Sequence, residues 1–279
     1  MIAKILALCL MAASCFGEGP YVTSELWGQF GNQMFAMATA TSLALDNGAE
    51  AVFPDLATNN NFAIPENYAH VFYHINAAPL TEPISYVYNE PHYHYSPIPY
   101  HPNMVIRGWF QSEKYFLNHK QEIIDLFSPH PEIVAYLENK YPNIVHNPKT
   151  VSIHYRYYME DPNHDVYAKC DLDYYQKAIA LFPEDTLFVV FSNQIDWCKE
   201  NFAHIPRDFY FVEGEPHYHD FYLMSLCQHN IIGNSTFSWW AAYLNRNPGR
   251  LVIVPPQWFN PWYGANDKDL IPPEWTILR

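Results

Sequence analysis

The sequence predicts an α/β protein whose second half is built around a parallel sheet. First, short strands rich in β-branched and aromatic residues alternate with amphipathic helices between residues 151 and 254. Second, residues 220–244 contain a helix, a strand, a polar turn and a second helix in direct succession. Third, the chain has 279 residues, of which 49% are hydrophobic and 17% aromatic. This length and composition are sufficient for two domains with large cores.

The first half begins with a glycine-containing turn at residues 27–35, followed by a helix at residues 33–45 that is rich in small residues. Asn47-Gly48 ends this helix, because both residues tolerate a left-handed backbone. We expect a strand at residues 51–53 and a proline-rich, loop-rich insertion at residues 54–104. The next expected elements are a strand at residues 105–110, a helix capped by Ser112 that extends to residue 127, and a helix at residues 131–140.

A turn-rich segment at residues 141–150 marks the predicted domain boundary. The strands expected after it lie at residues 151–156, 187–192, 209–212, 230–232 and 251–254. The helices expected between them lie at residues 173–181, 194–202, 220–227 and 237–244. Regular alternation of this kind predicts parallel strands with helices on both faces of the sheet.

The charge balance limits the partners that the surface can attract. Fifteen basic residues against 29 acidic residues give a net charge of −14. An acidic surface of this kind argues against a nucleic-acid partner. An anionic ligand would have to be held by local donors, so an arginine at the end of a buried strand becomes a candidate ligand contact.

Residues 1–19 are predicted to be a leader or membrane anchor. A short positive start at Lys4 precedes an apolar run that is too short to span a bilayer. A misassigned start codon or a buried first strand are the alternatives. A leader would place the protein at a membrane or in a secretory pathway, and its absence would leave it cytoplasmic. The cysteines beyond this segment, Cys170, Cys198 and Cys227, have no metal-binding spacing and are expected to be buried free thiols.

Two polar turns are candidate anion sites. Residues 233–236 form a small polar turn at the carboxyl end of a strand and open a helix, which is where open α/β sheets bind ligands. Gly28 and Gly31 precede a second helix, whose first turn holds Asn32 and Gln33. Free amides and the helix dipole at such ends attract anions. An ordinary strand-to-helix turn is the alternative for the glycine segment, which lacks the spacing of dinucleotide and ATP-binding loops.

The strand at residues 151–156 ends with His154 and Arg156, and period-two alternation places both side chains on one face. An arginine there can grip a phosphate through two hydrogen bonds. A structural arginine paired with a carboxylate and a satisfied core histidine are the alternatives. Asp171 and Asp173 form an acidic pair that could hold a metal, but they directly precede a helix, so N-capping is favoured. The histidine clusters lack a metal-binding frame, and no metal site is predicted.

Taken together, these segments resemble glycosyltransferase family 11, the α-1,2-fucosyltransferases. The resemblance runs from about residue 26 to residue 256 and is carried by GQFGNQMFAMA, RGWFQSEKYF, VSIHYR, CDLDYYQKAI, FVVFSNQIDWCKENF and DFYLMSLCQHNIIGNSTFSWWAAYLN. It implies two Rossmann-like domains that face a cleft in the GT-B arrangement. It also implies GDP-fucose as the donor, a galactose-containing glycan as the acceptor, inversion at the sugar carbon and no required cofactor or metal.

The resemblance also implies an arrangement of site residues. Residues 20–149 would form the acceptor-side domain and residues 150–279 the GDP-fucose-binding domain. Arg156 would neutralise the leaving diphosphate, His154 would lie near the guanosine, and Asp220 would accept hydrogen bonds from the guanine edge. Ser235, Thr236 and Phe237 would hold phosphate and base, and Ser192 would add a donor contact. Across a cleft from them, Gly31 and Asn32 would lie beside the sugar-phosphate, with Gln33 as a further donor contact. The predicted catalytic residues are thus Arg156, His154 and Asn32.

One departure from the family pattern bears on activity. The family continues the His-x-Arg element with a second arginine, a glycine and an aspartate, whereas this chain has Tyr157-Tyr158-Met159. Loss of a phosphate-facing arginine leaves two alternatives to α-1,2-fucosyl transfer. These are a non-catalytic member that binds nucleotide or glycan, and a fucosyltransferase acting on a protein or another glycan. A third, metal-dependent alternative would use Asp171 and Asp173.

Overall fold

The computed structural model describes residues 19–58, 64–158 and 165–279. All but the last residue of the predicted leader, along with Met159, lie outside this part of the chain. Within it, no helix combines the length and the apolar character needed to cross a membrane.

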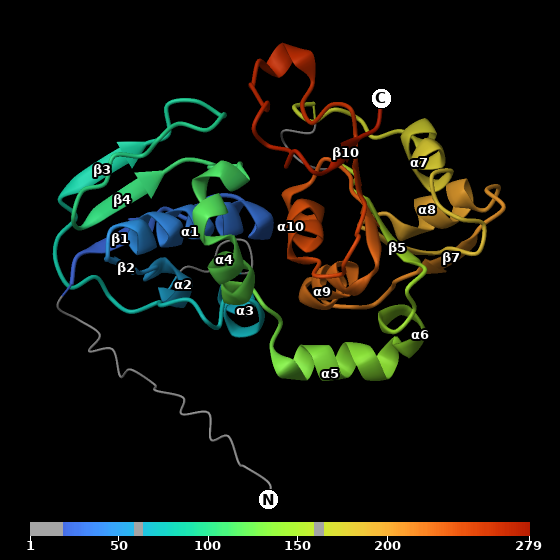
Figure 1. Cartoon of the computed structure of the whole chain (residues 1–279), viewed down its shortest axis with the longest axis horizontal. Coiled ribbons are helices and arrows are strands. Elements are labelled where there is room, and N and C mark those ends of the chain that lie inside the picture. Colours follow the sequence, from blue (N-terminus) through green and yellow to red (C-terminus); the bar gives the residue numbers. More distant parts are fainter. Residues whose placement is uncertain (1–18, 59–63, 159–164) are drawn as a thin grey trace, which may run out of the picture.

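Two parallel sheets organise the chain (Figure 1). The four-stranded sheet has the order β2-β1-β4-β3 and is formed by β1 (Tyr21–Ser24), β2 (Glu50–Ala51), β3 (Tyr86–Asn89) and β4 (Met104–Arg107). The six-stranded sheet has the order β10-β9-β8-β5-β6-β7 and is formed by β5 (Thr150–Tyr155), β6 (Leu187–Ser192), β7 (Asp208–Phe211), β8 (His229–Ile231), β9 (Val252–Val254) and β10 (Thr276–Ile277). The predicted α/β class with a parallel sheet in the second half is therefore confirmed.

Helices cover the six-stranded sheet on both faces, as the nearly unbroken apolar strands require. One face packs against α7 (Leu172–Ile179) and α8 (Ile195–Phe202). The opposite face packs against α9 (His217–Leu226) and α10 (Thr236–Leu244). All six residues of β5 are buried, which places its carboxyl end at the centre of this half of the molecule.

The two halves share one hydrophobic core, in which α1 (Phe30–Asp46) packs against α10. Phe35 of α1 lies between Trp239 and Trp240, with ring centroids 4.5 and 5.0 Å away. The small residues predicted for this helix permit the approach. The remaining helices are α2 (Asp55–Thr58), α3 (Ile64–His70), α4 (Lys120–Leu126), α5 (Pro131–Lys140) and α6 (Pro142–Val145). Figure 1 shows α5 and α6 connecting the two halves below the core.

Several element predictions need correction. The segment predicted as one helix from Ser112 to residue 127 is two 3-10 turns followed by α4, although Ser112 does cap the first turn through Lys114 N. Strands β1, β3 and β10 were not predicted, because they have only two to four residues each and β3 lies in the proline-rich segment. Cys198 and Cys227 are buried free thiols as predicted, and the free thiol of Cys170 is half-buried.

Candidate active site

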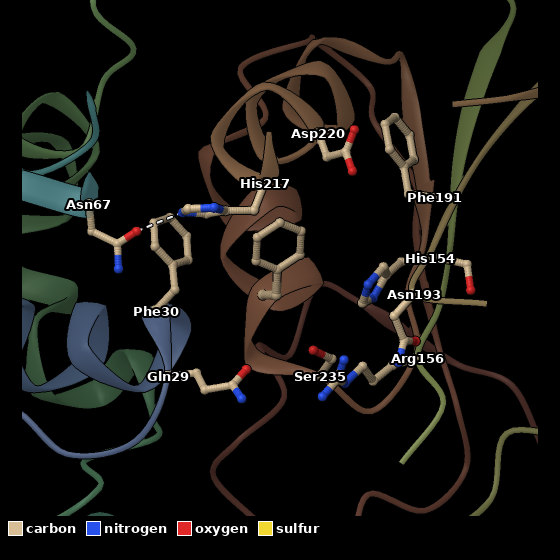
Figure 2. Close-up of a pocket in the computed structure, with 12 residues that line it drawn as sticks. Gln29, Phe30, Asn67, His154, Arg156, Phe191, Asn193, His217, Asp220 and Ser235 are labelled. Carbon is tan, nitrogen blue, oxygen red and sulfur yellow. Dashed lines mark hydrogen bonds between the residues drawn. The ribbon is translucent and has the colours of Figure 1, made fainter. Parts of the chain in front are cut away.

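A cavity of about 500 Å³ opens between the two halves of the molecule (Figure 2). Its walls come from the turn before α1, from α3, from the carboxyl ends of β5 and β6, and from the first turns of α9 and α10. The lining residues are Gln29, Phe30, Asn67, His154, Arg156, Phe191, Ser192, Asn193, His217, Asp220, Ser235 and Phe237. This is the position at which an open parallel sheet binds its ligands.

His154 of β5 and Arg156, the residue that directly follows this strand, both line the cavity, as the alternation of the sequence predicted. His154 is buried, its Nδ1 has no hydrogen-bond partner, and burial together with the Arg156 charge lowers its pKa to about 3. The imidazole is therefore neutral near pH 7. The guanidinium carbon of Arg156 lies 5.2 Å from the centroid of the Tyr158 ring, within the range of a cation–π contact.

The segment that follows β5 is fixed by Asn193. The Asn193 side-chain amide donates to Tyr157 O, and its Oδ1 accepts from Tyr157 N, both at 2.9 Å. Tyr158 is locked in turn, because its hydroxyl donates to Asn234 O at 2.8 Å and its ring stacks on Tyr167 at 4.1 Å. Arg156 thus projects from a backbone that is held on both sides of it.

Asp220 lies on the first turn of α9 and points into the cavity near Phe191 (Figure 2). Its Oδ1 is buried without a hydrogen-bond partner. Burial, followed by the nearby negative charge of Glu215, raises the pKa of Asp220 to about 7. A desolvated carboxyl group with a free oxygen is arranged to accept hydrogen bonds from a ligand.

The N-termini of α1 and α10 meet beside the cavity. A Cβ on Gly31 would lie 2.6 Å from the Thr236 carbonyl carbon, so only glycine permits this approach. Ser235 is the N-cap residue of α10 and lies in Figure 2 beside Arg156 and Gln29. A positive side chain and a helix N-terminus therefore meet at the end of the cavity opposite Asp220, a combination that suits an anion.

The cavity thus has three chemically distinct parts. Asp220 and His154 offer hydrogen-bonding groups that lack partners, and Phe30, Phe191 and Phe237 provide apolar walls. Arg156 and Ser235 supply the anion-binding end. A flat heterocycle joined to a diphosphate through a neutral linker satisfies all three parts.

Six of the predicted site residues line this cavity, namely His154, Arg156, Ser192, Asp220, Ser235 and Phe237. Four do not. Gly31 and Thr236 do not face each other across a cleft, because they are in contact. Gln33 is fully buried and its side-chain amide donates to Gly28 O at 2.9 Å, and Asn32 lines a separate cavity.

Asp171 and Asp173 stabilise α7, as the favoured interpretation predicted. Asp171 accepts a hydrogen bond from Tyr174 N at 3.1 Å and caps α7, and Asp173 forms an ion pair with Lys177 at 2.6 Å. Across the described ranges, no three His, Cys, Asp or Glu side chains come together as a metal site.

Six lining residues were not predicted, namely Gln29, Phe30, Asn67, Phe191, Asn193 and His217. His217 reaches the cavity because α9 begins at residue 217, three residues before the predicted start. Its Nε2 lies 2.7 Å from Oδ1 of Asn67 on α3, which connects the two halves (Figure 2). Pro216, which directly precedes α9 in an extended conformation, is the residue that could have indicated this earlier helix start.

Comparison with known proteins identifies relatives that are similar to this chain in sequence. A segment is 33% identical over 182 residues to the alpha-1,2-colitosyltransferase of Escherichia coli, covering 62% of this chain and 61% of that protein. The chain is also 29% identical over 287 residues to galactoside alpha-(1,2)-fucosyltransferase 2 of Oryctolagus cuniculus, covering 88% of this chain and 77% of that protein. The match to the colitosyltransferase thus spans only about three fifths of that relative's length.

Among solved structures, NodZ alpha-1,6-fucosyltransferase co-crystallized with GDP superposes with a TM-score of 0.53 at 15% sequence identity. The superposition covers 80% of this chain and 92% of NodZ. This likeness supports the predicted GT-B-like arrangement of the fold. The model of glycosyl transferase family 11 matches residues 7–279, nearly the whole chain. The chain therefore belongs to glycosyl transferase family 11.

Proposed function

We propose that this protein transfers L-fucose from GDP-fucose to the 2-hydroxyl of a galactoside, with inversion at the sugar carbon and without a required metal. The observation that supports this most directly is the cavity, which holds the partnerless carboxyl of Asp220 near one end and Arg156 beside a helix N-terminus at the other. Relatives named as galactoside alpha-(1,2)-fucosyltransferases support the acceptor class.

The donor is proposed to lie along the cavity with guanine at Asp220. Guanine presents N–H donors on its edge, and the Asp220 carboxylate accepts them. The diphosphate lies at Arg156 and the first turn of α10, where charge and oriented amides oppose its negative charge. The predicted division is kept as part of this proposal, with residues 150–279 supplying most of the GDP-fucose contacts and residues 20–149 most of the acceptor contacts.

In the transfer step, the acceptor oxygen attacks the sugar carbon as the bond from that carbon to the diphosphate oxygen breaks. The bonding electrons leave with GDP, and the acceptor hydroxyl loses its proton to a base. Negative charge grows on the departing diphosphate, and Arg156 with the α10 amides stabilises it in the transition state.

Incubation with labelled GDP-fucose and a panel of β-galactosides, with EDTA present throughout, tests this function. Product linkage and anomeric configuration by NMR test the 2-hydroxyl position and the inversion. Absence of transfer together with absence of GDP binding by calorimetry would refute the proposal. Activity that disappears in EDTA and returns with Mn²⁺ would refute metal independence alone.

A second candidate is a member that binds nucleotide or glycan without turnover. The residues that replace the family's second arginine favour this alternative. Tyr157 occupies that position and is held through its backbone, and Tyr158 fills the adjoining space. GDP binding without transfer to a galactoside, protein or other glycan acceptor would establish this alternative.

We also propose that residues 1–19 act as a leader or anchor, which would associate the protein with a membrane or a secretory pathway. Mass spectrometry of the native N-terminus tests this, because an uncleaved, unmodified start found in the soluble fraction would contradict both roles.

A further inference from the structure

A second groove, lined by aromatic residues, lies beyond the donor cavity. One part encloses about 560 Å³ and another about 180 Å³, and both parts have Tyr93, Trp109 and Tyr263 in their walls. Trp27 completes the larger part, and Tyr167 with Phe259 completes the smaller one. Trp27, Trp109 and Tyr263 are 45%, 37% and 45% exposed, so the groove presents ring surface to solvent.

Residues 107–111 (RGWFQ), none of which lines the donor cavity, form part of this groove. The carboxylate of Glu90 accepts hydrogen bonds from Trp109 N at 2.7 Å and Phe110 N at 3.1 Å, which fixes the Trp109 backbone. Gly108 makes room for it, since a Cβ there would lie 2.4 Å from the Glu90 Cβ. Phe110 adopts a φ of 49°, a strained value for a residue with a side chain.

The same segment connects the groove to the first turn of α1. Tyr93 donates its hydroxyl hydrogen to Gln111 Oε1, and Gln111 Nε2 donates to Asn32 Oδ1 at 2.8 Å. Asn32 lines the groove, whereas Gln29 at the start of the same helix lines the donor cavity. Tyr167, which also lines the groove, stacks on Tyr158, whose ring contacts Arg156.

The groove therefore ends where the proposed diphosphate and fucose would lie. Its chemistry also selects a ligand class. Exposed aromatic rings accept the C–H face of a pyranose, while amide and carboxylate groups beside them bind hydroxyls. Its arginine, Arg107, forms an ion pair with Glu25 at 2.6 Å, and Glu90 adds a second carboxylate, so the lining favours a neutral sugar over an anionic one.

We infer that this groove is the acceptor site and binds a neutral galactose-containing oligosaccharide against Trp109 and Tyr263. This inference rests on the proposed function, because it assigns the second substrate of that reaction. It gives a role to a segment whose contacts do not otherwise serve the donor cavity.

The test compares wild type, Trp109→Ala and Tyr263→Ala, with Trp262→Ala as the control. Trp262 is 63% exposed, adjoins Tyr263 and does not line the groove. GDP affinity by calorimetry establishes that each variant is folded with its donor cavity intact. Transfer to N-acetyllactosamine gives the acceptor KM, and saturation-transfer NMR with methyl β-galactoside measures sugar binding independently of transfer.

We expect each groove variant to raise the acceptor KM about 5- to 10-fold and to weaken the NMR signal, with GDP affinity unchanged. The Trp262→Ala protein should match wild type in all three measurements. Equal KM and equal NMR signals in all four proteins would overturn the groove assignment and leave the proposed function standing. Absence of transfer from wild type, with sugar binding lost in the groove variants alone, would overturn the proposed function and support the groove.

Discussion

Replacement of Asp220 by asparagine should make the ligand-free protein more stable and weaken its hold on guanine. The substitution keeps the size of the side chain and removes its charge. In the folded protein this carboxyl is buried, has a partnerless oxygen and lies near the negative charge of Glu215. Its ionised form is therefore costly until a ligand supplies hydrogen-bond donors.

The magnitude follows from the pKa of Asp220. A rise from 3.8 to about 7 corresponds to roughly 4 kcal/mol at most. The sign is fixed by linkage, because a raised folded-state pKa favours the protonated group. The stability that the raised pKa contributes is fully present below pH 3.8, declines as the pH rises to about 7, and is lost above that pH. Asp220→Asn should therefore gain several degrees in Tm at pH 8, and the gain should shrink toward pH 4.

Ligand binding should change in the opposite direction. Loss of charged hydrogen bonds to the guanine edge costs about 1.5–3 kcal/mol, a weakening of roughly 10- to 150-fold. Guanosine is the informative ligand because it lacks phosphates that titrate near pH 7, and inosine lacks the amino group that Asp220 would bind. In wild type, guanosine affinity should fall about tenfold per pH unit below the Asp220 pKa, since binding requires the ionised carboxyl.

Calorimetry with guanosine and inosine, together with thermal denaturation from pH 4 to pH 8, measures both effects. His154, with a pKa of about 3, and Glu215, with a pKa of about 2, do not titrate in the pH 6–8 window, and burial lowers the pKa of His217. If Asp220→Asn bound guanosine as wild type does and kept the same preference over inosine, the guanine assignment would be wrong. An unchanged Tm at pH 8 would show that the carboxyl is not desolvated.

Three further outcomes are expected. Arg156→Ala should weaken GDP binding about 10- to 100-fold and abolish transfer, whereas Arg156→Lys should retain part of the affinity; equal GDP affinity in Arg156→Ala by calorimetry would contradict its role. Gly31→Ala should lower stability by about 1–3 kcal/mol in denaturant unfolding, because its Cβ would press on Thr236, and an unchanged unfolding midpoint would show that this contact yields without cost. Tyr157→Arg, which returns a basic group after Arg156, should raise the transfer rate up to about tenfold in steady-state assays, and a rate at or below wild type would show that no phosphate lies within its reach.

The sequence alone predicted the parts of the site that depend on local patterns. Alternation along β5 predicted that His154 and Arg156 share a face, and the polar turn before α10 predicted that Ser235 opens a helix. These features depend on residues close together in the chain, where period and capping preferences act directly. The capping role of Asp171 followed from the same local chemistry.

What could not be predicted depends on how the two halves pack. Gly31 was expected to face Thr236 across a cleft, yet the two are in contact because small residues let α1 and α10 approach closely. Asn67 and His217 meet across 150 residues of sequence, and no local pattern encodes that distance. The role proposed for residues 107–111 could not be predicted for the same reason, because their partners Glu90 and Asn32 come from other segments.

The contact between Gly31 and Thr236 also has an electrostatic consequence. It brings together the N-termini of a 17-residue helix and a 9-residue helix, each equivalent to roughly half a positive charge, with Arg156 nearby at the cavity. Like charges converging in a partly desolvated space repel each other, and an anion between them removes the repulsion. At the far end of the same cavity, the Asp220 carboxyl carries the opposite penalty. A ligand with an anionic end and a hydrogen-bond-donating end relieves both costs at once, whereas an inorganic phosphate or a free base relieves only one. The proposed binding of a nucleoside diphosphate is therefore compatible with a net charge of −14, because the favourable interactions arise locally at the two ends of the cavity.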